Sequence, residues 1–318
     1  MTRPAPAPLQ PIHLENPHLR LSVVPEAGGK IASLVDRSTG REWLWSNPAL
    51  PLRAPAYGSS YVLDHDSGGF DECFPAIAEG AFPSAPWQGV EIPDHGELWG
   101  LSWDCRRDGL SLAMGVDGVR FPYRFERTLT LLPDAAAVRL AYRVINRAPF
   151  PFPFVWSSHP LLAIAPGMRL LLPEGTPLRV FGASDPALGD LGAPLRWPLL
   201  QHLDLATVPG PEAGYAVKLF GPSPERGWVG LHDPATRSTL RFEYDPLTIP
   251  HLGLWLNMGA WSPREDRAPY FNLGIEPCIG AGDDLALAVR RYRAHGVIPP
   301  RGEREWSMTV RLVQETLA

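Results

Sequence analysis

Short runs in which hydrophobic and polar residues alternate recur along the whole chain. Alternation puts every second side chain on one face, so each run predicts a β-strand with one buried face. The longest runs are consecutive, at 110–116, 121–132 and 137–146, and Pro133-Asp134 supplies a turn before the third. Shorter runs lie at 19–24, 30–35, 42–45, 168–172, 215–220, 228–232, 239–244, 253–257, 271–276 and 306–313.

The run 121–132 shows the pattern best. Phe121, Tyr123 and Phe125 point to one face of the predicted strand. Arg124 and Glu126 point to the other. The first face is therefore expected in the core and the second in solvent.

Helical periodicity is confined to one segment, 283–293. There Asp283-Asp284 can cap the helix, and Leu285, Ala288 and Tyr292 fall on one face. The 37 prolines and 30 glycines are scattered along the chain, as expected of many short strands joined by turns. We therefore predict an all-β protein, a pair of large packed antiparallel sheets with one or two short helices.

The predicted domain organisation is simple. A Pro/Ala-rich tail, residues 1–12, precedes one β domain over 13–318. The segment has no apolar core of a signal peptide, and no stretch of the sequence is long and apolar enough to span a membrane. Three cysteines, far apart and without CxxC spacing, argue against a disulfide framework or a thiolate zinc site and favour a cytoplasmic location.

The charge of the chain narrows the choice of partners. Its formal net charge is −5 and it has no basic run, so nucleic acid and anionic membranes are not expected partners. Arginine greatly outnumbers lysine, and the two lysines, Lys30 and Lys218, stand out for that reason.

Titratable side chains stand out in three segments, 93–103, 146–160 and 271–284. Glu276 closes an apolar run before a proline, where a carboxylate in an aromatic setting suits a general acid or base. His159 follows an aromatic run, and His95 lies in a loop between an acid and a glycine. The alternatives are a solvated carboxylate at a strand end and histidines that are satisfied in the core.

These three segments, in this order, resemble the signature regions of the aldose 1-epimerase (galactose mutarotase) superfamily. Two turns, 28–31 and 300–303, are also similar to turns of that family. The likeness extends over about residues 20–313. The matching signature residues, in chain order, are His95, Gly96, Trp103, Asn146, 149–153, His159, Pro160, Glu276, Pro277, Gly280 and Asp283.

The resemblance implies a galactose mutarotase-like supersandwich that interconverts the α and β anomers of an aldose. Glu276 would remove the proton of the anomeric hydroxyl while His159 protonates the ring oxygen, and closure on the other face would give the other anomer. His95 would stabilise the developing charge. The two acid–base groups should then have pKa values near the working pH. A small sugar is the implied partner, a monomer or homodimer the implied assembly, and neither metal nor organic cofactor is implied.

Departures from the family pattern concern the residues around the sugar. Asp71 and Glu72 stand where the family carries Asn-Arg, and they could accept bonds from sugar hydroxyls. Trp99 replaces an arginine and could stack on the sugar. A family aspartate is replaced by alanine, and Lys218, two residues on, could donate to a hydroxyl instead. Trp156 is a further expected sugar contact. Each of these has a structural alternative, in the core or on the surface.

Two other readings of the same residues stay open. The lost family residues suit a non-catalytic sugar-binding protein on this scaffold. The set His95, His159 and Glu276 could instead hold iron or zinc in a β-sandwich enzyme. A sugar phosphate is less favoured as a substrate, because a phosphate would call for clustered arginines.

Overall fold

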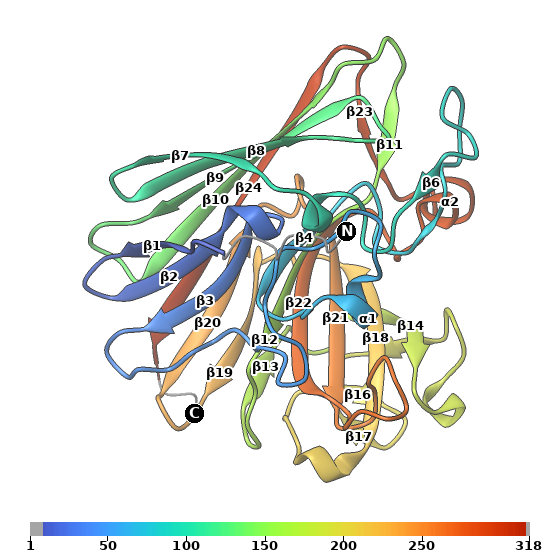
Figure 1. Cartoon of the computed structure of the whole chain (residues 1–318). Helices are drawn as coiled ribbons and strands as arrows, with labels where there is room; N and C mark the ends of the chain where they lie inside the picture. Colours follow the sequence, from blue (N-terminus) through green and yellow to red (C-terminus); the bar gives the residue numbers. More distant parts are fainter. Residues whose placement is uncertain (1–8, 316–318) are drawn as a thin grey trace.

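Two large antiparallel sheets form the framework of residues 9–315, the part of the chain that the structure, a computed structural model, describes (Figure 1). The first has twelve strands. In spatial order they are β1 (Ile12–Glu15), β2 (Leu19–Val24), β3 (Lys30–Asp36), β4 (Phe70–Cys73), β12 (Trp156–Leu162), β22 (Phe271–Ile279), β21 (His251–Met258), β18 (Tyr215–Pro222), β14 (Pro177–Ala183), β15 (Pro194–Arg196), β16 (Leu199–Leu200) and β17 (Leu203–Asp204).

The second sheet has eight strands and includes the three long runs of the sequence. In spatial order they are β13 (Arg169–Leu171), β19 (Trp228–Asp233), β20 (Ser238–Tyr244), β24 (Glu303–Gln314), β10 (Ala137–Asn146), β9 (Tyr123–Leu131), β8 (Ser111–Asp117) and β7 (Asp104–Asp108). Two small pairs complete the β structure, β5 (Gly80–Ala81) with β6 (Glu91–Ile92), and β11 (Phe152–Phe154) with β23 (Gly296–Ile298).

Helices in the described part are short. They are α1 (Tyr61–Asp64) and α2 (Leu285–Leu287), the latter continued by a π-helical turn over Ala288–Tyr292. Asp284 caps α2, because its side chain accepts a hydrogen bond from the Leu287 N–H. The predicted helix over 283–293 is thus confirmed in place and in its capping residue. Single 3₁₀ turns lie at Pro25–Ala27, Leu98–Gly100, Pro186–Leu188 and Pro211–Ala213.

The core lies between the two sheets and is rich in aromatic rings. Trp156 of the twelve-stranded sheet meets Tyr142 and Trp306 of the eight-stranded sheet, with ring centroids 4.9 and 5.0 Å apart. Along β9 the buried positions alternate with partly exposed ones, as the sequence predicted for Tyr123 and Phe125. The predicted all-β architecture of packed antiparallel sheets is confirmed.

One predicted strand is wrong. Residues 42–45 form only isolated bridges, at Glu42 and Leu44. The Glu42 carboxylate explains this, because it accepts hydrogen bonds from the backbone N–H groups of Leu34 and Leu44 and so replaces ladder partners. The predicted tail falls mostly on residues 1–8, which lie outside the described part, and β1 already begins at Ile12.

The strand that carries Glu276 also differs from its prediction. It continues through Pro277 to Ile279, so Glu276 lies within the strand and not at its end. Pro277 is tolerated because the ladder between β12 and β22 is interrupted between Ser157 and Leu161, where no donor is needed from Pro277.

Candidate functional site

His159 and Glu276 come together on the outer face of the twelve-stranded sheet. Their strands, β12 and β22, are neighbours, and the register on either side of the interruption sets the two residues opposite each other. The Nε2 atom of His159 lies 3.8 Å from Oε1 of Glu276. Both are deeply buried, His159 at 7% exposure and Glu276 at 0%. The convergence on which the sequence-based mechanism depends is therefore present.

Two glycines leave room around the Glu276 carboxylate. A Cβ atom added at Gly274 would lie 3.1 Å from Oε1, and one added at Gly253, in the adjacent strand β21, would lie 3.1 Å from Oε2. Any larger residue at either position would press on the carboxylate. The sequence pattern of the strands did not reveal this requirement.

Lys218 of β18 reaches over the sheet to the same carboxylate. Its Nζ lies 3.3 Å from Oε2 of Glu276 and 3.0 Å from Oδ1 of Asp283. Burial by itself would lower the pKa of Lys218, but the charges of Asp283 and Glu276 outweigh it and raise that pKa. Lys218 therefore carries a positive charge inside the site, and Oε1 is the carboxylate oxygen left facing His159.

His95 lies in a loop above these groups. Its φ of +57° is a left-handed conformation, and its Nδ1 donates to Oδ1 of Asp94 at 2.6 Å. The next residue must be glycine, because a Cβ at Gly96 would lie 2.1 Å from the carbonyl oxygen of Phe74. The ring of His95 meets that of His159 edge-on, 5.2 Å between centroids.

Tyr61 of α1 links the two histidines to a buried charge network. Its ring stacks on His95 at 4.1 Å, and its hydroxyl donates to Oδ2 of Asp71 at 2.9 Å while lying 3.5 Å from Nδ1 of His159. Asp71 also forms an ion pair with Lys30 at 2.5 Å. Asp71 is opposite His159 in the ladder and on the same face of the sheet, but it lies behind Tyr61 and does not line the cavity, contrary to its prediction as a sugar contact.

The cavity above these residues has a volume of about 220 Å³. Trp255, Trp261 and Tyr270 are among its lining residues, together with His95, His159, Lys218 and Glu276. Asn272 also lines it, and neither atom of its buried amide has a hydrogen-bond partner among residues 9–315. Buried amides are normally satisfied, so Asn272 is a polar group available to a ligand.

Sequence reasoning missed five of these residues, namely Tyr61, Trp255, Trp261, Tyr270 and Asn272. Trp255 lies on a predicted strand, two residues from Gly253 and therefore on the same face. That spacing would have placed Trp255 in the site only if the pairing of Gly253 with Glu276 had been known. Tyr61 had no such signal, because it lies on the short helix α1 and its contacts Asp71, His95 and His159 come from other segments of the chain.

Burial controls the proton on His159. It lowers the pKa of His159 well below the usual 6.5, and the neighbouring His95 and Lys218 act in the same direction. Asp71 and Asp283 act in the opposite direction but do not compensate. The imidazole is therefore neutral in the unliganded site at neutral pH, which contradicts the prediction of a pKa near the working pH.

Glu72 and Trp156 are core residues, contrary to their prediction as sugar contacts. They lie on the inner face of the sheet, and Glu72 accepts hydrogen bonds from Trp156 Nε1, Arg127 Nη1 and the Tyr142 hydroxyl, each at 2.9 Å. A neighbour in the strand always faces the other way, which explains why Asp71 and Glu72 cannot share one site. Trp99 is also buried; its Nε1 donates to the Asp94 carbonyl and its ring supports Tyr61.

His65 lies beside Tyr61 and Trp99 and gives the fold a pH dependence. Burial and, next, the charge of Lys30 lower its pKa to about 3. Between pH 6.5 and that value the unfolded chain binds a proton that the folded chain does not, so stability falls as the pH falls. We expect His65 to contribute a loss of up to about 1.4 kcal/mol per pH unit over this range.

Urea unfolding at pH 7 and pH 5 measures this loss. The variant His65→Gln should lose part of the pH dependence, whereas His13→Gln, at an exposed position, should keep all of it. Equal pH dependence in the wild type and in His65→Gln would contradict the expectation.

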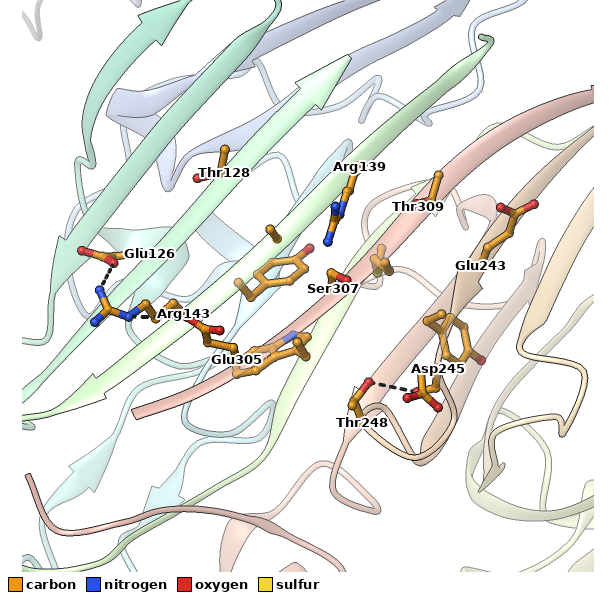
Figure 2. A pocket seen from close by; sticks show the side chains of 15 residues that line it. Glu126, Thr128, Arg139, Arg143, Glu243, Asp245, Thr248, Glu305, Ser307 and Thr309 are labelled. Carbon is orange, nitrogen blue, oxygen red and sulfur yellow. Dashed lines mark hydrogen bonds and ion pairs between the residues drawn. The ribbon is translucent and has the colours of Figure 1, made fainter. Parts of the chain in front are cut away.

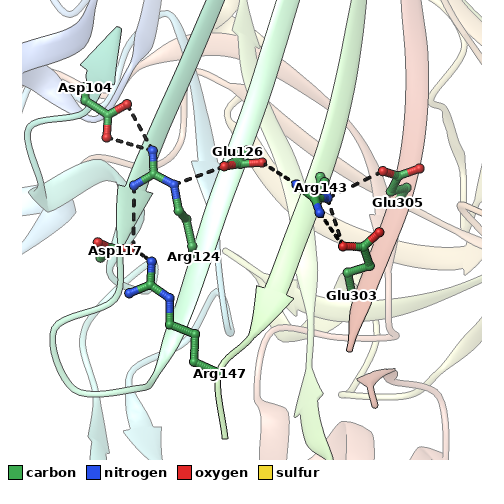
Figure 3. A network of polar contacts seen from close by, with 8 residues as sticks. All are labelled: Asp104, Asp117, Arg124, Glu126, Arg143, Arg147, Glu303 and Glu305. Carbon is green, nitrogen blue, oxygen red and sulfur yellow. Dashed lines mark hydrogen bonds and ion pairs between the residues drawn. The ribbon is translucent and has the colours of Figure 1, made fainter. Parts of the chain in front are cut away.

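Another hollow, of about 560 Å³, lies on the outer face of the eight-stranded sheet (Figure 2). Most of its lining side chains are polar, and it contains no histidine. Arg143 there is paired with Glu126 and Glu303, within a surface network that continues to Arg124 and Arg147 (Figure 3). Exposed pairs of this kind contribute little to stability or chemistry, so the 220 Å³ cavity is the candidate site.

Comparison with solved structures identifies the fold of this chain. Slr1438 from Synechocystis sp. PCC 6803 superposes with a TM-score of 0.70 at 16% identity, over 99% of this chain and 100% of that one. A galactose mutarotase related enzyme from Lactobacillus acidophilus gives 0.69 at 12%, over 96% and 98%. A galactose mutarotase-like protein from Lactobacillus casei gives 0.64 at 18%, over 96% and 100%. The chain has the galactose mutarotase-like fold.

Comparison of the sequence with known proteins says less about the function than comparison of the structure does. Residues 1–92 match a family described as a domain of unknown function, DUF5107. No curated protein matches the chain. Within residues 9–315, no three or more His, Cys, Asp and Glu side chains are grouped so as to hold a metal ion. No helix in that range has the length and apolar character needed to cross a membrane.

Proposed function

We propose that this protein is an aldose 1-epimerase-like enzyme that interconverts the anomers of a sugar by acid–base ring opening. The observation that carries the proposal is the approach of His159 Nε2 to Glu276 Oε1, 3.8 Å apart, at the floor of a cavity. The ring oxygen and the anomeric hydroxyl are bonded to one carbon, so a base and an acid acting on them must be near neighbours.

In the forward step Oε1 of Glu276 accepts the proton of the anomeric hydroxyl. The electron pair of that O–H bond forms the aldehyde, the bond from the anomeric carbon to the ring oxygen breaks, and protonated His159 donates a proton to the ring oxygen. Rotation about the C1–C2 bond and the reverse proton transfers close the ring on the other face. Lys218 holds Oε2 throughout, which fixes the direction of Oε1.

The remaining lining residues suit a sugar. Trp255 and Trp261, whose rings are 5.6 Å apart and perpendicular, offer flat apolar surface to a pyranose. The unpartnered amide of Asn272 can bind hydroxyls from both its oxygen and its nitrogen. The hydrogen bond of His95 to Asp94 uses Nδ1, and among residues 9–315 its Nε2 has no hydrogen-bond partner.

We expect His159→Ala to lower the enzyme-catalysed rate of anomer exchange by about 10²- to 10⁴-fold, the usual contribution of a positioned acid. The rate is measured by polarimetry or NMR saturation transfer on glucose and galactose, after subtraction of the spontaneous rate. His202→Ala, an exposed histidine, is the control. An unchanged rate in His159→Ala would remove this residue from the mechanism.

The wild-type rate should also depend on pH. The mechanism uses the charged imidazole, and the lowered pKa of His159 makes that form scarce at neutral pH. The fraction of charged His159 therefore grows as the pH falls, by about tenfold per unit. We expect kcat/KM to rise between pH 8 and pH 6; a fall over that range would contradict the assignment of His159 as the acid.

One observation favours a second function, a sugar-binding protein without catalysis. Lys218 holds the Glu276 carboxylate in an ion pair, which makes it a weaker base, and His159 is neutral, which leaves it without the proton of a charged acid. Both groups can still form hydrogen bonds with a sugar. The same NMR experiment separates the two functions. Sugar binding without faster anomer exchange at any pH between 5 and 8 would favour the binding protein.

A further inference from the structure

A groove of about 840 Å³ lies on the same face of the twelve-stranded sheet as the candidate site. It is bounded by β14, β15, the ends of β18 and β21, and the π-helical turn after α2. In Figure 1, β14 lies beyond β18, on the side of β18 that faces away from β21 and β22. Its size is within the range of ligand pockets, about 300–1,000 Å³.

The charged residues that line this groove are all positive. Arg179, Arg196 and Arg291 line it, and none of its lining residues is Asp or Glu. This is unusual in a chain with a net charge of −5. Within residues 9–315 none of the three guanidinium groups forms a salt bridge, although elsewhere arginines pair extensively. Three unpaired guanidinium groups around one hollow form a site for an anion.

The three arginines are placed together by the fold. Arg179 and Arg196 project from adjacent strands on one face, because Arg179 is opposite Pro194 and Arg196 opposite Pro177. Each uses one Nη1 to donate to a backbone carbonyl, that of Gly192 or Gly175, which orients the guanidinium and leaves its other N–H groups free. Arg291 comes from the other wall.

Aromatic rings form part of the same groove. The rings of Phe181 and Tyr292 are 5.6 Å apart, and Phe181 is 4.9 Å from Phe220. The half-buried ring of His251 also lines the groove. A site with flat apolar surfaces between cations suits a sugar ring that carries an acidic group.

The groove and the candidate site lie along one row of paired residues across the sheet. Glu276 is opposite Gly253, Gly253 opposite Phe220, and Phe220 opposite Arg179. At about 4.8 Å per strand, these three steps put the Cα atoms of Glu276 and Arg179 roughly 14 Å apart. The loop between the two hollows contributes Ala281 to the groove and Asp283 to the cavity. This separation is longer than one sugar ring and suits a second one.

We propose that the arginine groove binds the carboxylate of a second sugar unit, so that the ligand of this protein is an acidic carbohydrate of at least two rings. Its reducing end occupies the 220 Å³ cavity and its acidic unit lies between Arg179, Arg196 and Arg291. The placement of the reducing end rests on the proposed function, whereas the recognition of the acidic group rests on the groove alone.

The test is calorimetric binding of matched disaccharides that differ only at C6 of the non-reducing unit, as carboxylate or as hydroxymethyl, in the gluco, galacto and manno series. We expect at least one acidic member to bind about tenfold or more tightly than its neutral partner, since charge-assisted bonds are roughly twice as strong as neutral ones. The advantage should shrink in high salt.

Variants of exposed residues assign the effect to the groove. In the triple variant Arg179→Gln, Arg196→Gln, Arg291→Gln, the acidic disaccharide should bind no more tightly than its neutral partner binds to the same variant. Arg139→Gln, in the hollow of Figure 2, should keep the preference. No preference in any series, or a preference that survives the triple variant, would overturn the proposal. Because binding is measured apart from anomer exchange, failure of the proposed catalysis would show separately, as preferential binding without faster exchange.

Discussion

Glu276→Gln is expected to abolish enzyme-catalysed anomer exchange, a loss of at least about 10²- to 10⁴-fold. The amide has nearly the shape of the carboxylate, so it fits between Gly253 and Gly274, but it cannot take a proton from the anomeric hydroxyl. NMR saturation transfer between the two anomers measures the rate. Sugar affinity should change much less than the rate, because Asn272 and the tryptophans remain in place.

The matched control is Glu79→Gln, which alters an exposed carboxylate near the cavity without touching it. It should exchange anomers at the wild-type rate. Wild-type turnover in Glu276→Gln would take Glu276 out of the mechanism and with it the proposed function. Equal losses in the two variants would point to an effect on the fold instead.

Arg127→Met is expected to destabilise the protein by about 3–5 kcal/mol, the usual result of removing one partner of a buried ion pair. Arg127 and Glu72 are both fully buried between the sheets, with Nη1 and Oε1 2.9 Å apart. Arg127 also donates to the carbonyl of Gly29. Without the arginine, the Glu72 carboxylate stays buried with only the Tyr142 hydroxyl and Trp156 N–H as partners. Urea unfolding measures the change.

The pH dependence of this variant has a defined sign. Burial raises the pKa of Glu72, although Arg127, Tyr142 and Trp156 oppose it. A raised pKa means that the folded state holds the proton more firmly, so stability is lost as the pH rises through the folded value. Without Arg127 that pKa rises further. The destabilisation should therefore be larger at pH 8 than at pH 5.

Two further variants test the cause. The double variant Arg127→Met, Glu72→Gln removes the uncompensated charge and should recover part of the loss. Arg124→Met breaks the exposed network of Figure 3 and should cost at most about 1 kcal/mol. If Arg127→Met were no more harmful than Arg124→Met, the buried pair would not be holding the two sheets together.

The candidate site lies on the outer face of the twelve-stranded sheet, where polar side chains can be buried without lying in the core. Strands are most regular where they pack on the core, and the inner face of the twelve-stranded sheet is apolar apart from residues such as Glu72. The outer face is covered by the loops that carry Tyr61, His95 and Asp283, so polar side chains there are buried and yet line a hollow. Burial of charged groups beside a cavity is costly for stability, and such sites are candidates for function.

The sequence determined the local structure of this protein. Alternation predicted the strands at 19–24 and 137–146 with their observed bounds, because each strand must bury one face whatever its neighbours are. The prolines, glycines and the Asp284 cap fixed several turns and the one predicted helix by local chemistry. The three signature segments contain Glu276, His159 and His95, and all three residues line the cavity, while their catalytic roles stay a prediction.

Only the tertiary structure decided which side chains meet. Asp71 and Glu72 look equivalent in the sequence, yet the pleat sends one towards Tyr61 and the other into the core with Arg127. The cavity wall of Trp255, Tyr270 and Asn272 and the row from Glu276 to Arg179 join strands that are far apart in the chain. Strand order and register are set by packing over the whole molecule, and a pattern read along one segment carries no information about its neighbours across the sheet.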